Sequence, residues 1–163
     1  MSSFTGKVWK LGDDIDTDII IPTEFLAMKS VDDMKKHAFH PLRPELAALI
    51  KPGDIIVAGK NFGCGSSREQ APEILAALKV GCVIAKSYAR IFYRNAFNNG
   101  LMLLENDQLY DLCNEGDTLT VELEKGQVKL GERTFQVAAI PPDLLQMVQD
   151  GGLVATMRKR NKK

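Results

Sequence analysis

The stretch from residue 52 to residue 70 is PGDIIVAGKNFGCGSSREQ. It begins with a short apolar run at 54–58, which is typical of a strand buried on both faces. A glycine-rich loop and a helix-forming segment that ends at Gly81 follow it. The alternation then continues with a predicted strand at 82–85, a helix at 88–98 ended by Gly100, and a strand at 101–104. Strands that alternate with helices are typical of parallel crossovers, so the predicted fold class is α/β.

The flanking segments add an antiparallel layer to this parallel unit. We expect strands at 7–11, 19–21, 118–124, 127–130 and 134–139, and helices at 30–39, 45–50, 108–113 and 143–150. Ser30 is placed to cap the helix that it begins, and the basic end, MRKRNKK, is expected to be a solvated or frayed tail. The chain shows no internal repeat, and we expect residues 1–163 to form a single domain.

Charge and composition exclude several classes of protein. Lys plus Arg and Asp plus Glu both number 21, which argues against a nucleic-acid-binding module. No apolar run is long enough to cross a bilayer, and the first residues do not resemble a signal peptide, so we expect a cytoplasmic protein without a membrane segment. The cysteines are Cys64, Cys82 and Cys113, and their wide spacing predicts neither a disulfide framework nor a metal site on this chain.

The loop at 59–69 is the strongest candidate for a binding site. Its glycines let the backbone approach a ligand, and Ser66, Ser67 and Arg68 supply hydroxyls and a cation just before a helix. These groups suit a small carboxylate or a phosphate. The spacing matches neither a Walker A loop nor a Rossmann fingerprint, so nucleotide binding is disfavoured.

Ser66 has two possible roles at this point. With Glu69 it fits a capping box, in which it would only begin the helix. Pro72 argues that the helix begins later and leaves Ser66 in the loop. A Ser–His–Asp hydrolase fits poorly because His37 and His40 lie together at an exposed helix end. A packed thiol is the favoured interpretation of Cys64.

Two further segments carry polar or aromatic clusters. DDIDTD at 13–18 is either an acidic turn or the mouth of the site, and it lacks the glycine and glutamate of a calcium loop. SYARIFYRNAFNNG at 87–100 combines aromatic residues with arginines. An RNA-binding surface is one interpretation, but the zero net charge favours an ordinary packed helix.

The chain resembles the small subunits of the isopropylmalate isomerases, within the aconitase superfamily. The resemblance rests on DTDIIIP at 16–22, GKNFGCGSSRE at 59–69 and SYARIFYRNAFNNGL at 87–101, with PGDIIVAG at 52–59 and GGL at 151–153. Gln70 and Tyr88 stand where the family usually has His and Phe. The resemblance implies an aconitase-type swivelling β/β/α domain that works with a separate large subunit, which would carry a [4Fe–4S] cluster.

The resemblance also implies roles for individual residues. Ser66 matches a catalytic base, Ser67 and Arg68 match groups that hold a substrate carboxylate, and Asp18 with Thr17 matches the side of the cleft. Ala27 and Met28 lie in the loop that reads the substrate in the family, where an apolar pair would favour an isopropyl or methyl branch.

The implied activity is a dehydration and rehydration that interconverts 2- and 3-isopropylmalate, hydroxy-dicarboxylates of leucine biosynthesis. The alternatives are a related hydro-lyase acting on dimethylmalate, citramalate or homoaconitate, and a non-catalytic carboxylate-binding module. A homo-oligomer is one expected state of the isolated chain, and Lys29 is close enough in sequence to enter the site.

Overall fold

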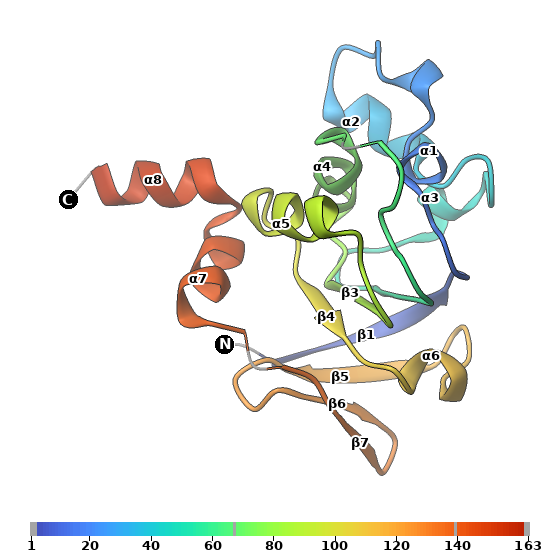
Figure 1. Ribbon diagram of the computed structural model, residues 1–163, viewed down its shortest axis with the longest axis vertical. Helices are drawn as coiled ribbons and strands as arrows, with labels where there is room; N and C mark the ends of the chain where they lie inside the picture. The colour runs from blue at the N-terminus through green and yellow to red at the C-terminus, as the bar shows by residue number, and fades with distance from the viewer. Residues whose placement is uncertain (1–2, 67, 139, 162–163) are drawn as a thin grey trace.

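A mixed seven-stranded sheet forms the centre of the molecule. The computed structural model describes residues 3–66, 68–138 and 140–161. The strand order is β4-β3-β2-β1-β5-β6-β7 (Figure 1). The strands are β1 (Ser3–Lys10), β2 (Ile55–Ala58), β3 (Cys82–Ala85), β4 (Leu103–Glu105), β5 (Thr118–Glu122), β6 (Gln127–Leu130) and β7 (Arg133–Gln136).

Strand β1 joins a parallel half of the sheet to an antiparallel half. It pairs in parallel with β2, with Val8 opposite Ile55, and antiparallel with β5, with Gly6 opposite Leu119. β2, β3 and β4 continue the parallel half, and β5, β6 and β7 continue the antiparallel half. Every residue of β2 and β3 is buried, as expected for apolar strands covered on both faces.

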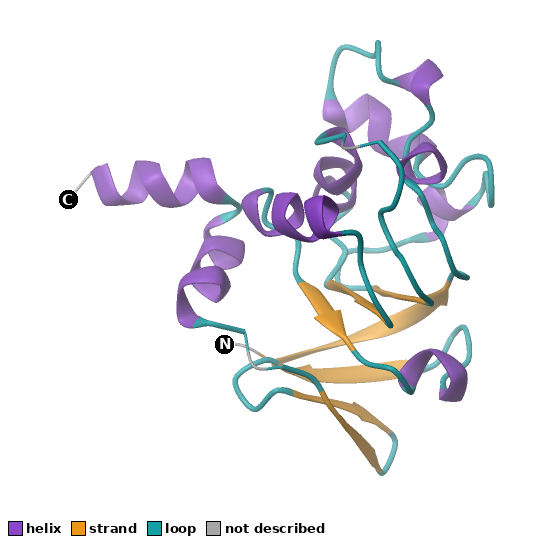
Figure 2. Ribbon diagram, viewed as in Figure 1, coloured by secondary structure: helices purple, strands orange, loops and turns teal. Residues whose placement is uncertain are grey.

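Most helices gather at the parallel half of the sheet (Figure 2). They are α1 (Thr17–Ile20), α2 (Val31–Met34), α3 (Leu46–Leu49), α4 (Gln70–Ala77), α5 (Arg90–Asn98), α6 (Leu109–Leu112), α7 (Pro142–Asp150) and α8 (Leu153–Asn161), with 3₁₀ turns at Thr23–Phe25 and Lys35–His37. α8 extends away from the rest of the molecule, at the left of Figure 1. None of the helices in the described ranges is long and apolar enough to span a bilayer.

The structure confirms the mixed α/β class and the predicted strands at 82–85 and 127–130, and it corrects three local predictions. Residues 17–20 form helix α1 instead of a strand at 19–21, because Asp16 Oδ1 accepts from Ile19 N at 2.8 Å and caps a helical turn. Ser30 caps α2 as predicted, but the α-helix stops at Met34 and continues only as a 3₁₀ turn.

The third correction concerns the basic end of the chain. The side chains of Arg158, Lys159 and Arg160 are exposed, which confirms the solvated alternative, but the segment is helical up to Asn161 instead of frayed. Residues 162–163 lie outside the described residues. Asp150, at the end of α7, accepts hydrogen bonds from Thr156 Oγ1 and Lys159 Nζ, both at 2.8 Å. Hydrogen bonds across the turn between the two helices therefore hold α8 against α7.

Candidate active site

The candidate site lies where the parallel strands end. The loops after β1, β2 and β3 meet at the carboxyl edge of the sheet, which is where open α/β sheets bind ligands. The glycine-rich loop after β2 bonds to both neighbouring loops. Gly63 N donates to Ile15 O at 2.8 Å, and Phe62 N donates to Ser87 O at 3.1 Å. The backbone of the loop is therefore fixed by its neighbours on both sides.

Backbone conformation favours glycine at two positions of this loop, and at Gly63 a close contact requires it as well. Gly63 has φ +82°, and a Cβ there would lie 2.2 Å from Phe92 Cγ. Gly65 has φ +92° and passes close to Asp16 and Thr17. Any larger side chain at Gly63 would displace the ring of Phe92 below it. Because residue 63 is a glycine, the loop is able to lie directly on α5.

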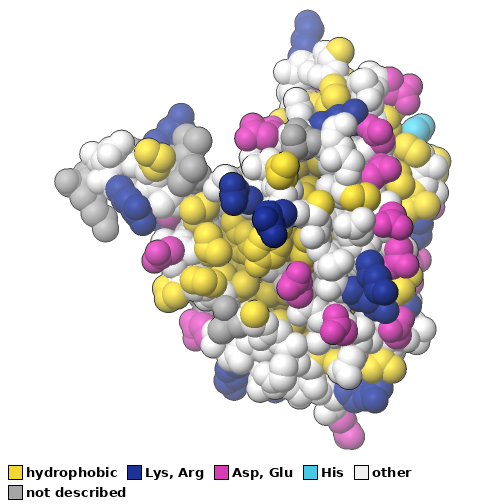
Figure 3. All heavy atoms as spheres, in the orientation of Figure 1, with side chains coloured by type: hydrophobic (Ala, Val, Ile, Leu, Met, Phe, Trp, Pro, Cys, Tyr) yellow, Lys and Arg dark blue, Asp and Glu magenta, His cyan; other side chains and the backbone are white. Residues whose placement is uncertain are grey.

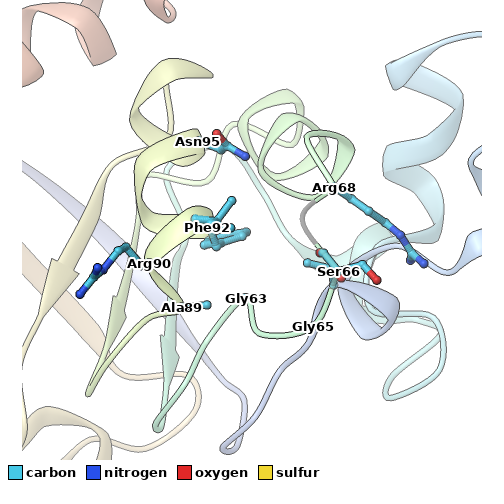
Figure 4. Close-up of a pocket in the computed structure, with 10 residues that line it drawn as sticks. Gly63, Gly65, Ser66, Arg68, Ala89, Arg90, Phe92 and Asn95 are labelled. Atoms are coloured by element: carbon cyan, nitrogen blue, oxygen red, sulfur yellow. The ribbon is translucent and has the colours of Figure 1, made fainter.

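A pocket of about 230 Å³ opens between this loop and α5 (Figure 4). Its described lining residues are Thr17, Gly63, Gly65, Ser66, Arg68, Ala89, Arg90, Ile91, Phe92 and Asn95. The polar side chains on the loop side are a hydroxyl pair and a guanidinium, and the opposite wall is mainly apolar. This combination suits a small anion that also carries a hydrocarbon group.

Ser66 lies in the loop and not at the helix terminus. α4 begins at Gln70 with Glu69 as its N-cap, so the capping-box interpretation of Ser66 is wrong. Pro72 lies in the first turn of α4, where proline is tolerated, and the interpretation that leaves Ser66 in the loop is confirmed. Thr17 Oγ1 donates to Ser66 O at 2.8 Å, which fixes the backbone of Ser66 and leaves its hydroxyl for other contacts.

Arg68 points away from Phe92 and Asn95 in this structure (Figure 4). Its guanidinium forms an ion pair with Asp18 and donates to Ile21 O at 3.2 Å and to Thr23 Oγ1 at 3.0 Å. The side chain of Arg68 is 17% exposed and that of Asp18 is 63% exposed. Asp18 therefore contacts Arg68, which lines the pocket, but does not itself line the pocket.

The loop at 24–29, which was expected to recognise the substrate, lies outside this pocket. None of the described residues that line it comes from 24–29, so Ala27 and Met28 are not brought together with Ser66. Instead, the segment folds on itself: Met28 N donates to Phe25 O at 3.2 Å, and Phe25 stacks on His37 at 3.9 Å. Lys29 is exposed. Ser67 lies outside the described residues.

Helix α5 contributes residues that the sequence did not single out. The expected packed helix is only half of its role: Phe92 is 4% exposed, whereas Ile91 is 58% exposed and lines the pocket. Asn95 follows Ile91 by one helical turn on the same face. The spacing of Ile91 and Asn95 was visible in the sequence, but only the position of α5 beside the loop turns this face into a wall of the site.

The positions of the cysteines and histidines do not support an alternative nucleophile or metal site. Burial, together with Asp16 and Asp14, raises the pKa of the Cys64 thiol, which keeps it protonated and favours the packed-thiol interpretation. His37 and His40 pack with Phe25 and do not line the pocket. Within the described residues, no group of three or more His, Cys, Asp or Glu side chains is arranged to hold a metal ion.

Known proteins resemble this chain over nearly its full length. Residues 14–109 match the model of the aconitase C-terminal domain. A 3-isopropylmalate dehydratase small subunit from Lachnospira eligens is 63% identical, and the match covers 97% of this chain and 96% of the relative. A protein of the same name from Syntrophus aciditrophicus is 48% identical, covering 98% of each chain.

A solved structure agrees with the sequence comparison. The crystal structure of 3-isopropylmalate dehydratase from Methanocaldococcus jannaschii has a TM-score of 0.90 and is 37% identical to this chain. The match covers 98% of this chain and 95% of that one. Fold and sequence thus indicate the same group of proteins.

Proposed function

This chain belongs to the 3-isopropylmalate dehydratase small subunits of the aconitase C-terminal domain family, and from this premise we propose that the Ser66 pocket is its half of the active site. As the small subunit of a hydro-lyase, it acts with a large subunit. The reaction interconverts 2- and 3-isopropylmalate by loss and return of water, a step of leucine biosynthesis.

Ser66 is the proposed base that removes the carbon-bound proton. A serine hydroxyl is far too weak an acid to ionise readily in water, and burial alone disfavours its anion. This role therefore requires a nearby cation and N–H donors that stabilise the alkoxide, in a site from which water is excluded so that they are not screened. The fixed backbone of Ser66 and the adjacent cation of Arg68 support it. A large subunit that covers the open side of the pocket would provide the exclusion of water.

Arg68 is the proposed ligand of a substrate carboxylate, together with Ser67. Its planar guanidinium can hold a carboxylate through two parallel hydrogen bonds. In the structure one nitrogen of this fork pairs with Asp18 and the other donates to Thr23 Oγ1, so the substrate carboxylate would have to displace both contacts. Binding of substrate would therefore compete with the ion pair between Asp18 and Arg68.

The iron–sulfur cluster implied by the resemblance does not fit the described residues of this chain. Cys82 and Cys113 are buried, and Cys64 is partly buried without other candidate ligands grouped around it. We therefore propose that the large subunit carries the [4Fe–4S] cluster. This chain supplies the proton acceptor, the carboxylate-binding cation and the walls that orient the substrate.

The observation that carries this proposal is the convergence of Thr17, Ser66 and Arg68 on one pocket. The test is to combine the chain anaerobically with a large subunit and to measure dehydration of 3-isopropylmalate against 2,3-dimethylmalate, citramalate and homoaconitate. Preferential turnover of 3-isopropylmalate is expected. Turnover of dimethylmalate alone, or of none of the four compounds, would overturn the proposed function.

A further inference from the structure

The pocket beside Ser66 has two chemically different walls. Thr17, Ser66 and Arg68 supply the polar wall, from α1 and the glycine-rich loop. Helix α5 and the residue before it supply the other wall, in which Ala89, Ile91 and Phe92 are apolar and Arg90 and Asn95 are polar. A ligand that fills this pocket therefore needs an anionic part and a hydrocarbon part in close proximity.

The apolar wall is rigid at its base and exposed at its rim. Phe92 is held beneath Gly63, and its ring packs edge-on against Phe62 with 5.4 Å between centroids. Ile91 is 58% exposed, the most exposed of the large apolar side chains among the described residues. Because Ile91 also lines the pocket, contact with a ligand would remove this apolar surface from water.

We propose that Ile91, supported by Ala89 and Phe92, contacts the isopropyl branch of the substrate and sets the preference for branched malates. This inference rests on the proposed function and deepens it. It adds the face of α5 that borders the pocket to the loop of Ala27 and Met28, which the resemblance implies as a determinant of specificity. The carboxylate side of the same substrate would lie toward Ser66 and Arg68.

The test compares two malates that differ only in their branch, using the assembled two-subunit enzyme. For Ile91→Ala, kcat/KM for 3-isopropylmalate should fall about tenfold or more, because contacts with hydrocarbon groups discriminate on this scale. With 3-methylmalate, which lacks the outer methyl groups, the same variant should lose less than about threefold. Ile91→Leu should keep most of the selectivity, because it restores apolar volume.

Two further variants serve as controls. Leu49→Ala removes an apolar side chain of comparable exposure, 46%, from α3, and should change neither substrate's kcat/KM. Met28→Ala tests the loop at 24–29. A selectivity change in Met28→Ala with none in Ile91→Ala would overturn the proposal.

An interface role for Ile91 gives a different result. If Ile91→Ala weakens assembly with the large subunit, as measured by sedimentation, and lowers turnover of both malates equally, Ile91 is a subunit contact and the proposal is wrong. If the unaltered enzyme does not turn over 3-isopropylmalate, the proposed function has failed before this question arises. The two failures are thus distinguishable.

Discussion

The carboxylate of Asp18 holds the guanidinium of Arg68 toward α1 and away from the apolar wall of the pocket (Figure 4). The space-filling view shows negative and positive side chains close together mainly at its right, whereas hydrophobic side chains gather at its left centre (Figure 3). In the proposed function the substrate carboxylate must compete with Asp18 for Arg68. The strength of this ion pair therefore contributes to the apparent affinity for substrate.

Replacing Asp18 by Asn should lower KM for 3-isopropylmalate about two- to fivefold. Exposed ion pairs contribute roughly 0.2–1 kcal/mol, and removing this one frees Arg68. Steady-state kinetics of the assembled enzyme measure the effect. Asp111→Asn, which removes a similarly exposed partner of Lys86 outside the pocket, is the control. A higher KM in Asp18→Asn would mean that Asp18 helps to bind substrate directly.

Ser66→Ala should lower kcat by at least about 100-fold and change KM less than about threefold, because proton transfer by a positioned base contributes on this scale. The melting temperature should be unchanged, since Ser66 does not cap α4. Ser30→Ala is the opposite case: it removes a true cap, with an expected loss of about 1 kcal/mol in the free energy of unfolding and no change in kcat. Near-normal turnover by Ser66→Ala would exclude Ser66 as the base.

Gly63→Ala should be far more damaging than Gly116→Ala. Both glycines have positive φ, +82° and +93°, so both substitutions strain the backbone by about 1 kcal/mol. Only at Gly63 does the new Cβ meet another side chain, that of Phe92. We expect Gly63→Ala to lower the free energy of unfolding by at least about 2 kcal/mol, measured by urea denaturation. Equal losses in the two variants would show that the loop does not press on α5.

The packing of α8 should be lost in acid. Hydrogen bonds from Lys159, Thr156 and Gln146 lower the pKa of Asp150 from 3.8 to about 2. Because the pKa in the folded protein is below the unfolded value, the stabilisation is fully present above about pH 4 and is lost as pH falls toward 2. The amide NMR shifts of α8 should titrate over this range. Asp150→Asn should remove the titration and loosen α8 already at neutral pH; a titration that persists in Asp150→Asn would assign it to another group.

Much of the fold follows from local patterns. The apolar runs at 54–58 and 82–85 predicted strands that are buried on both faces, and the structure has fully buried parallel strands at Ile55–Ala58 and Cys82–Ala85. The turn residues between the antiparallel strands also predicted where these strands lie, with bounds close to the observed ones. Residues 19–21 were predicted wrongly because three apolar residues are compatible with either a strand or one helical turn. The capping bond from Asp16 decides between them.

The candidate site was only partly predictable, for a different reason. Ser66 and Arg68 carry the chemistry in the same short loop, so the sequence was sufficient to name them. Ile91 and Asn95 have ordinary side chains for a helix surface, and nothing local distinguishes a face that borders a pocket from one that meets solvent. Ala27 and Met28 were named from a resemblance, and the described structure places them outside the pocket lining.

The sequence by itself determined the alternation of strands and helices, the glycine-rich loop and the polar groups on it. These depend on periodicity, turn chemistry and residue type, which act over a few residues. Only the tertiary structure decided that Arg68 pairs with Asp18, that Gly63 lies on Phe92, and that Ile91 faces the same pocket as Ser66. Each of these contacts joins segments far apart in the chain, and it forms only when the sheet brings the ends of its parallel strands together.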